Sequence, residues 1–511
     1  MQDTCFAPVS RRRFLAAGGA LFGSSLFADD VVPRRGKTVS IFHTTDLHGH
    51  IRPTMNYDGV GDLGGMARCA TQIRRWRKEF PDSILVDIGD VYQGTQVSLQ
   101  NKGKLMIELF NRLGYDHWVL GNHDFDWGRE TLDAAIAHSK CDVLTGNLTV
   151  DGKPAGVAGS VWEKVKPWSV REVGGFRIGM IGLITPGLPY WLAPATLGGV
   201  EATDPIVSLK KSLTEIQAEK PDAIVVLGHM GWRFADDFAN PVREMLESVE
   251  GVDVYLAGHS HQDQPSFMTG RVLCSQASYH GIHCGRIDLT FDRDSRKLID
   301  RRAFTVLMDS RFDLDPLVMQ VAEPELAKAD AQLEREVCTV TSKIEGGGRN
   351  SEVSKLLCES FAAALKKSGM PVDGVFHGTF SKDDILPGKL TVGDCWKILP
   401  YENGLITADL KADELLLILG EDKGSRTLWP FDVEISNSGE VTKFEIEGQP
   451  VDPVRRFRIA FNTYDGQSGG RSLPLLHEII MRPGSKRADT TVATRDALMD
   501  YLLDRQVIGG G

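Results

Sequence analysis

Several short polar stretches of the sequence carry residue types that can hold metal ions. The first, HTTDLHGH at residues 43–50, contains three histidines, although the whole chain of 511 residues has only 13. Four further stretches follow: DIGDVYQG, LGNHDFDWG, VLGHMG and AGHSHQ. Imidazole, carboxylate and amide oxygen together suit Zn, Mn or Fe better than Ca or Mg alone. Metal chemistry therefore requires that these distant stretches meet in the fold.

Each polar stretch ends a short run of aliphatic and β-branched residues that is typical of a strand. VSIFHT, SILVDIGD, AIVVLGH and VDVYLAGH are such runs, and amphipathic stretches such as MARCATQIRRWRKE lie between them. This alternation from about residue 38 to 305 predicts an α/β layered fold with buried central strands. Open α/β sheets carry their sites at the carboxyl ends of strands, where these polar stretches stand.

The strand ends supply seven candidate metal ligands. They are Asp46, His48, Asp90, Asn122, His229, His259 and His261. One carboxylate usually bridges the ions of a two-metal site, and Asp90 is the candidate bridge. Taken singly, D-x-H is more often a helix cap or a surface loop, G-N-H-D is also compatible with a turn that caps a helix, and G-H-x-H with a loop packed against a helix. Their joint occurrence at strand ends favours a site. The remaining histidines of this region lack such positions and are predicted to be structural: His43, His50 and His117.

The amino-acid composition of the chain limits which kinds of binding partner are expected. The net charge is −11, with 42% hydrophobic and 25% charged residues, as in ordinary globular proteins. Nucleic-acid polymers and anionic membranes bind proteins through clustered Lys and Arg. Because the net charge here is negative, neither is an expected partner. Of the eight cysteines, none forms a CxxC pair, which argues against a zinc–thiolate site or a disulfide framework.

Residues 1–29 resemble an export signal rather than part of the fold. Arg11 and Arg12 precede an apolar run that ends near Ala28, as in twin-arginine signal peptides. The run is shorter than the roughly 20 residues that span a bilayer. The sequence therefore predicts an exported, periplasmic protein without stable membrane insertion.

The pattern changes after residue 308. DPLVMQVAEPELAKADAQLEREV has apolar residues at helical spacing, and a glycine-rich turn, KIEGGGRNSE, follows it. We expect a catalytic domain at residues 38–308, a linking helix within 309–345 and an α+β domain at 346–507.

The five motifs D-L-H, G-D-V-Y-Q-G, G-N-H-D-F-D, G-H-M-G and G-H-S-H together resemble those of calcineurin-like metallophosphoesterases. HTTDLHGH, GGMARCAT and GNHDFDWG are similar to the exported, two-domain 5'-nucleotidase branch in particular. The resemblance implies a four-layer αββα sandwich domain followed by a C-terminal α+β domain of the 5'-nucleotidase type. It also implies two divalent ions (Zn, Mn, Fe or Co) and hydrolysis of 5'-nucleotides or related nucleotides by metal-bound hydroxide.

The same resemblance implies a role for each site residue. One metal would be held by Asp46, His48 and His261. The other would be held by Asn122, His229 and His259, with Asp90 shared. His123 would be the catalytic histidine and Asp126 the carboxylate that orients it.

The second domain departs from the pattern of the family, which usually has an Asn-Gly-Gly stretch ending in arginine. Here HGTFSKDDILPG has His377 and Lys382 instead, and lysine lacks the bidentate fork of arginine. In FNTYDGQSGGRS, Tyr464 is a candidate for stacking on a base, and Arg471 stands where an aspartate is common. The TLWPFD stretch offers two aromatic side chains that either stack on the substrate or pack in the core, Trp429 and Phe431.

Three alternatives stay open at this point. The substrate is another phosphoester, such as a 2',3'-cyclic nucleotide or a sugar phosphate, or it is a sulfur ester cleaved by a thiohydrolase. The thiohydrolases share this architecture but carry a different segment where GNHDF stands here. The third alternative is a non-catalytic metal-dependent binding protein, against which the presence of His123 and Asp126 argues. The sequence leaves base preference, native metals and oligomeric state open.

Overall fold

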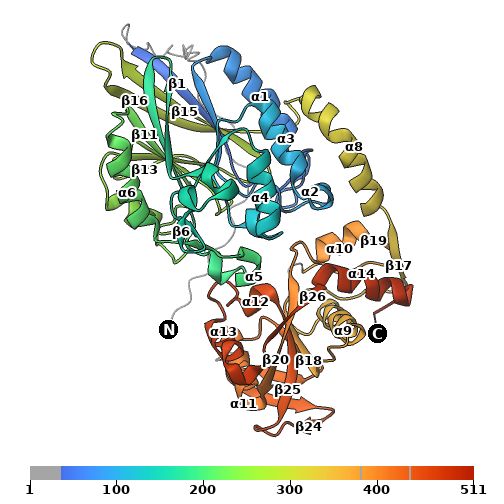
Figure 1. Ribbon diagram of the computed structural model, residues 1–511. Helices are drawn as coiled ribbons and strands as arrows, with labels where there is room; N and C mark the ends of the chain where they lie inside the picture. The colour runs from blue at the N-terminus through green and yellow to red at the C-terminus, as the bar shows by residue number, and fades with distance from the viewer. Residues whose placement is uncertain (1–35, 380–381, 437–438, 511) are drawn as a thin grey trace, which may run out of the picture.

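The computed structural model describes residues 36–379, 382–436 and 439–510, so the predicted export signal lies outside the described residues. In this described part of the chain, no helix is both long and apolar enough to cross a membrane. Figure 1 shows an N-terminal half above a C-terminal half, with helix α8 (Pro316–Leu333) running between them along one side.

Two sheets form the centre of the N-terminal half. The larger contains, in spatial order, β16 (Leu298–Leu307), β15 (His283–Asp292), β1 (Gly36–Thr44), β2 (Ser83–Asp87), β3 (His117–Trp118), β4 (Asp142–Leu144) and β7 (Val165–Lys166). The other contains β13 (Asp263–Thr269), β14 (Val272–Ala277), β12 (Val254–Ala257), β11 (Ala223–His229), β9 (Phe176–Ile184) and β8 (Trp168–Val173). Aliphatic side chains such as Ile41, Val86 and Val225 are buried between the two sheets.

Helices cover the outer face of each sheet (Figure 1). The larger sheet packs against α1 (Met66–Glu79), α3 (Lys104–Leu113) and α4 (Arg129–His138). The other packs against α6 (Pro205–Gln217) and α7 (Val242–Glu247). Short elements complete this half: α2 (Gln96–Asn101), α5 (Pro194–Leu197) and the sheet of β10 (Val200–Ala202), β5 (Leu148–Val150) and β6 (Lys153–Pro154). The order helix, sheet, sheet, helix confirms the predicted four-layer αββα sandwich.

The C-terminal half is built on one five-stranded sheet. Its order is β21 (Thr427–Trp429), β18 (Gly374–His377), β25 (Arg456–Asn462), β20 (Gly404–Lys411) and β26 (Ala488–Ala493). One face packs against α9 (Glu352–Lys367), α10 (Val392–Ile398) and α14 (Thr494–Arg505). The other packs against α11 (Ala412–Asp422) and α13 (Pro474–Met481), and α12 (Thr463–Gly466) follows β25. This mixture is the α+β fold predicted for the second domain.

Two small three-stranded sheets flank that core. The first is β19 (Gly388–Thr391), β17 (Glu336–Val340) and β27 (Val507–Ile508). The second is β22 (Asp432–Ile435), β23 (Val441–Ile446) and β24 (Gln449–Pro450).

Helix α8 connects the halves. It begins after Asp315, whose carboxylate accepts hydrogen bonds from the N–H groups of Leu317 and Val318 and so caps the helix. Its apolar side packs on the core of the N-terminal half, and Asp330 binds Arg52 at 2.6 Å. Because α8 lies inside 309–345, we propose 38–308 and 346–507 as the two domains.

The strands that precede the polar stretches end at one edge of the sandwich. β1, β2 and β3 are parallel neighbours in one sheet, and β11 and β12 are parallel neighbours in the other. The loops that follow them touch across the two sheets: the ring of His229 bonds the carbonyl of Ile88, which follows β2. The fold therefore gathers five loops, distant in sequence, at this edge.

Candidate metal centre and active site

The backbone at this edge is held in an unusual conformation. Five candidate ligands have φ between 47° and 70°: Asp46, His48, Asp90, His259 and His261. Residues other than glycine seldom adopt positive φ, and such strain persists only where the surroundings impose it, often at functional sites. Here the N–H of Asp46 donates to Gly89 O and that of His48 to Asp90 O, both at 2.9 Å, so the first two loops fix each other.

Four side chains form what we call the outer cluster: Asp46, His48, Asp90 and His261. The Nε2 atoms of His48 and His261 lie 3.1 Å apart and face the same point. Oδ1 of Asp46 lies 3.4 Å from Nε2 of His261, and Oδ2 of Asp90 lies 3.7 Å from Nε2 of His48. Two imidazole nitrogens and two carboxylates thus converge on one position.

A second group, the inner cluster, contains Asp90, His229 and His259. Oδ2 of Asp90 lies 3.1 Å from Nε2 of His229, which is also 3.2 Å from Oδ1 of Asn122. Asp90 is therefore the one side chain that belongs to both clusters. The structure thus brings together all seven side chains that the sequence nominated as ligands.

The donor set fits a pair of divalent cations. Oδ2 of Asp90 is buried and accepts no aligned hydrogen bond from any described residue, although a buried carboxylate oxygen needs a partner. Burial lowers the pKa of His48 and of His259 to about 3, which leaves both imidazoles in the neutral form that binds metals. Burial acts to lower the pKa of His229, but the charge of Asp90 outweighs it and raises this pKa to about 9. Imidazole nitrogens around a shared, orphaned carboxylate oxygen suit a dinuclear site for N/O-preferring metals.

Backbone carbonyls orient the rings of two of the clustered histidines. Nδ1 of His48 donates to Gln93 O at 2.8 Å, and Nδ1 of His229 donates to Ile88 O at 2.6 Å. These bonds place the proton on Nδ1 and turn Nε2 toward the cluster. The sequence offered no signal for them, because a backbone carbonyl acceptor is independent of residue type.

Asp124 ties two of the loops together. This buried carboxylate accepts hydrogen bonds from the N–H groups of Val91 at 2.9 Å and Gly121 at 2.8 Å, on either side of the cluster. Burial, together with the charge of Asp90, raises the pKa of Asp124 to about 7. Sequence reasoning placed Asp124 in a motif without recognising this structural role.

His123 and Asp126 lie beside the outer cluster. Nδ1 of His123 is 2.8 Å from Oδ2 of Asp126, and the rings of His123 and His48 have centroids 5.3 Å apart. Burial acts to lower the pKa of His123, but the charges of Asp126 and Asp90 outweigh it and raise this pKa to about 10. A protonated imidazole held in place by a carboxylate can donate a proton to a departing oxygen.

The C-terminal half contributes residues next to this edge that the sequence did not nominate. The ring of Tyr401 lies nearly parallel to that of His123, with centroids 6.2 Å apart. Its neighbour Glu402 accepts a hydrogen bond from Gln93 at 2.9 Å and pairs with Arg495 of its own half. Neither residue stands in a recognisable motif.

The predicted substrate residues lie in three different settings. Tyr464 is half-buried, beside the Gly470 loop that meets Trp191, and Trp191 lies 5.0 Å from the ring of His259. Arg471 reaches the other half, with its guanidinium 5.3 Å from the ring of Tyr190. Lys382 is exposed on the connection between β18 and β19.

The aromatic pair of TLWPFD is not brought to the clusters. Phe431 is 6% exposed and packs between Phe444 and Phe457 in the core of the C-terminal half. Trp429 is half-buried and packs on the core beneath α9. Of the two readings offered by the sequence, this geometry favours packing.

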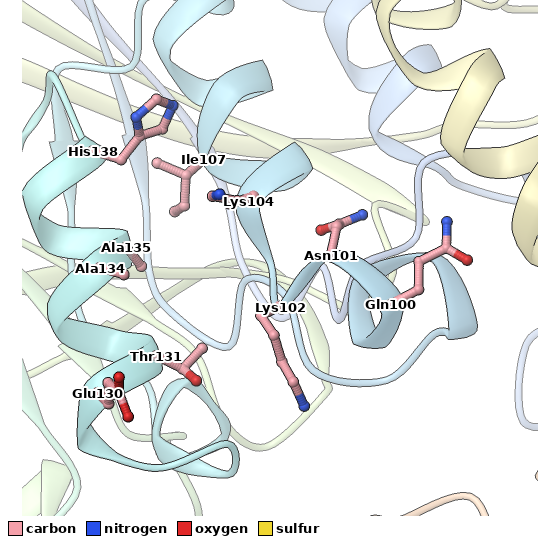
Figure 2. Close-up of a pocket in the computed structure, with 10 residues that line it drawn as sticks. All are labelled: Gln100, Asn101, Lys102, Lys104, Ile107, Glu130, Thr131, Ala134, Ala135 and His138. Carbon is pink, nitrogen blue, oxygen red and sulfur yellow. The ribbon is translucent and has the colours of Figure 1, made fainter.

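A hollow of about 520 Å³ lies elsewhere, between α2, α3 and α4 (Figure 2). Its floor is apolar, with Ile107 and Ala135, and its rim carries lysines. Figure 2 shows the amine of Lys102 pointing away from Lys104 and His138, so the basic groups do not converge on one ligand position. None of the predicted site residues lines this hollow.

Comparison with known proteins agrees with this geometry. Residues 39–263 match the family model described as calcineurin-like phosphoesterase. A snake venom 5'-nucleotidase of Naja atra is 30% identical over 320 residues, covering 58% of this chain and 57% of the relative. The 5'-nucleotidase of Bos taurus is 25% identical over 378 residues, covering 68% of this chain and 62% of the relative. The chain thus spans somewhat more than half the length of these relatives.

Among solved structures, a 5'-nucleotidase precursor from Thermus thermophilus has the same fold. It superposes with a TM-score of 0.71 at 24% identity, over 93% of this chain and 98% of that one. The family model covers the five strand-end motifs, and the structural match extends over both halves. Residues 39–263 thus form a domain that matches the calcineurin-like phosphoesterase family.

Proposed function

We propose that the chain is a dinuclear-metal phosphoester hydrolase that acts on 5'-nucleotides or related nucleotides. The observation that carries this proposal is the pair of clusters that share Asp90, with the His123–Asp126 pair beside them. The similarity to 5'-nucleotidases of Naja atra and Bos taurus supports the substrate class.

The outer and inner clusters define the two proposed sets of metal ligands. Asp46, His48 and His261 would hold one ion, and Asn122, His229 and His259 would hold the other, with Asp90 shared. Zn, Mn, Fe and Co all suit these nitrogen and oxygen donors. When bound, such ions supply Lewis acidity toward the phosphoryl oxygens and an activated water at neutral pH.

The residues of the chain supply orientation and a proton. Asp126 holds the ring of His123 by its Nδ1, so that Nε2 carries the proton that passes to the leaving oxygen of the ester. The N–H of His123 also donates to Oδ1 of Asp90 at 2.8 Å, which fixes the distance between the proton donor and the clusters. No covalent intermediate on the protein is required.

In the proposed substrate site, Tyr464 stacks on the base. Lys382 and Arg471 are the proposed cationic contacts, and they stand at positions where the family usually has an arginine and an aspartate. The contact of Arg471 with Tyr190 suggests that it also joins the two halves. Trp429 and Phe431 act as packing residues in this proposal. We further propose export through the twin-arginine segment, supported by Arg11 and Arg12.

Phosphate release from nucleoside monophosphates and sugar phosphates, and ring opening of cyclic nucleotides to monophosphates, measured separately with Mn and Zn, test the proposal. We expect release from at least one nucleotide class in the parent chain. His123→Ala should lower release about 10²- to 10⁴-fold while the chain keeps its bound metal. A metal-loaded parent chain that hydrolyses none of these esters overturns the proposal.

A further inference from the structure

His261 differs from His48 and His229 in its surroundings. Its side chain is 23% exposed, whereas that of His48 is 5% exposed and that of His229 is fully buried. His48 and His229 are anchored by backbone carbonyls of buried loops. Nδ1 of His261 instead lies 2.9 Å from the hydroxyl of Tyr57, a side chain that is 66% exposed.

The loop that carries Tyr57 is ordered by its own hydrogen bonds. Thr54 and Leu63 close its base with two backbone bonds of 2.7 and 3.0 Å. Within it, the side chain of Asn56 accepts the N–H groups of Asp58 and Val60. Tyr57 is thus presented by a closed loop on the surface, not by a strand end.

Tyr279 holds the ring of Tyr57 in place. The two rings stack with centroids 4.3 Å apart and planes 12° apart, and the Tyr57 N–H donates to the Tyr279 hydroxyl at 3.0 Å. Ring packing and a backbone bond therefore determine where the Tyr57 hydroxyl stands. Since Nε2 of His261 faces the outer cluster, its Nδ1 carries the proton and donates it to the Tyr57 oxygen.

We propose that Tyr57 is a positioning residue that fixes the ring of His261 and thereby sets the metal affinity of the outer cluster. In the inner cluster, buried main chain rather than an exposed tyrosine orients His229. The outer ion is consequently the exchangeable one of the pair. This inference rests on the proposed dinuclear site and deepens it by distinguishing its two halves.

Tyr57→Phe tests this, because it removes one oxygen and keeps the ring stacked on Tyr279. The full-length chain is equilibrated by dialysis at a series of free Mn concentrations, and bound Mn per chain is measured by mass spectrometry. We expect one ion to be retained as in the parent chain and the other to need about 10- to 100-fold more free Mn. The Mn concentration that half-activates phosphate release should rise by the same factor, with activity restored at saturation.

Tyr501→Phe is the matched control. Its hydroxyl donates to Glu359 at 2.7 Å in the C-terminal half, so the same atom is removed far from the clusters. Its Mn binding should equal that of the parent chain. The inference is overturned if Tyr57→Phe binds both ions with parental affinity, or if it weakens both equally, as general destabilisation would. A parent chain that binds no ion overturns the proposed function as well.

Discussion

The metal clusters and the substrate residues proposed in the C-terminal half differ in what holds their side chains. Each cluster residue ends a buried strand or lies in the loop after one, and neighbouring loops restrain the backbone there, as at Asp46 and His48. The C-terminal residues instead stand in a short helix and in loops near the contact between the halves, as Tyr464 and Arg471 do. The proposed metal chemistry thus belongs to the sandwich, whereas the proposed substrate contacts would depend on how two separately packed halves meet.

The largest effect should come from the residue that both clusters share. Asp90→Asn keeps the size of the side chain but removes the charge that two cations need. We expect kcat for phosphate release to fall more than about 10⁴-fold, with loss of bound metal. Asp142→Asn, in the same sheet but half-exposed and paired with Lys166, should behave as the parent chain. Retention of both metals by Asp90→Asn would show that Asp90 is not the bridge.

A smaller loss should follow from removing the proton donor. His123→Ala leaves every proposed ligand in place, so we expect about 10²- to 10⁴-fold lower kcat with two ions still bound per chain. Metal analysis alongside turnover separates these two quantities. Loss of metal together with activity would instead place His123 among the ligands.

Tyr464 and Phe431 differ in their expected roles within the C-terminal half: Tyr464 is proposed to contact the substrate, and Phe431 to pack in the core. Tyr464→Ala should raise KM for a nucleoside monophosphate about 10-fold and leave glycerol phosphate unaffected, because only the former has a base to stack on. Phe431→Ala should leave KM unchanged but lower the free energy of unfolding by about 3–5 kcal/mol, since Phe431 is a core side chain. The reverse pattern would mean that Phe431, not Tyr464, meets the substrate.

The smallest effect concerns His43, the first histidine of the opening stretch. It is buried, and neither ring nitrogen has a hydrogen-bond partner among the described residues. Burial lowers the pKa of His43 to about 3, so the folded chain binds fewer protons than the unfolded chain between about pH 6.5 and 3. Stability therefore falls as the pH drops through this window, by up to about 1.4 kcal/mol per pH unit from this group.

His43→Leu should remove that contribution, so that the free energy of unfolding changes less steeply with pH than in the parent chain. Urea unfolding at several pH values between 4 and 7 measures the slope. Equal slopes in the parent chain and His43→Leu would show that His43 is protonated in the folded state or hydrogen-bonded there.

The comparison also explains how far the sequence could predict the molecule. The strand and helix alternation predicted the αββα sandwich, and the strand-end motifs nominated side chains that the fold does bring together, because parallel strands end at one edge. The backbone carbonyls that orient His48 and His229 could not be predicted from the sequence, because every residue type has a carbonyl. Tyr57 was missed because its loop has no motif and its partner, His261, lies 204 positions away.

In the C-terminal half the sequence left two readings for the aromatic residues of TLWPFD, and only packing decides between them. Phe431 is buried among other aromatic rings, which no local pattern reveals. Likewise, the contacts of Tyr401 and Glu402 with the N-terminal half depend on the placement of two halves separated by α8. The assigned roles of the individual site residues stay predictions until they are measured.

Crystals of the full-length chain soaked with Mn, measured for anomalous scattering, test the central claim most directly. The account predicts two separate anomalous peaks at the strand-end edge, one within reach of His48 and His261, the other within reach of His229 and His259, with Asp90 touching both. A single peak, or Mn bound only away from these side chains, would contradict it.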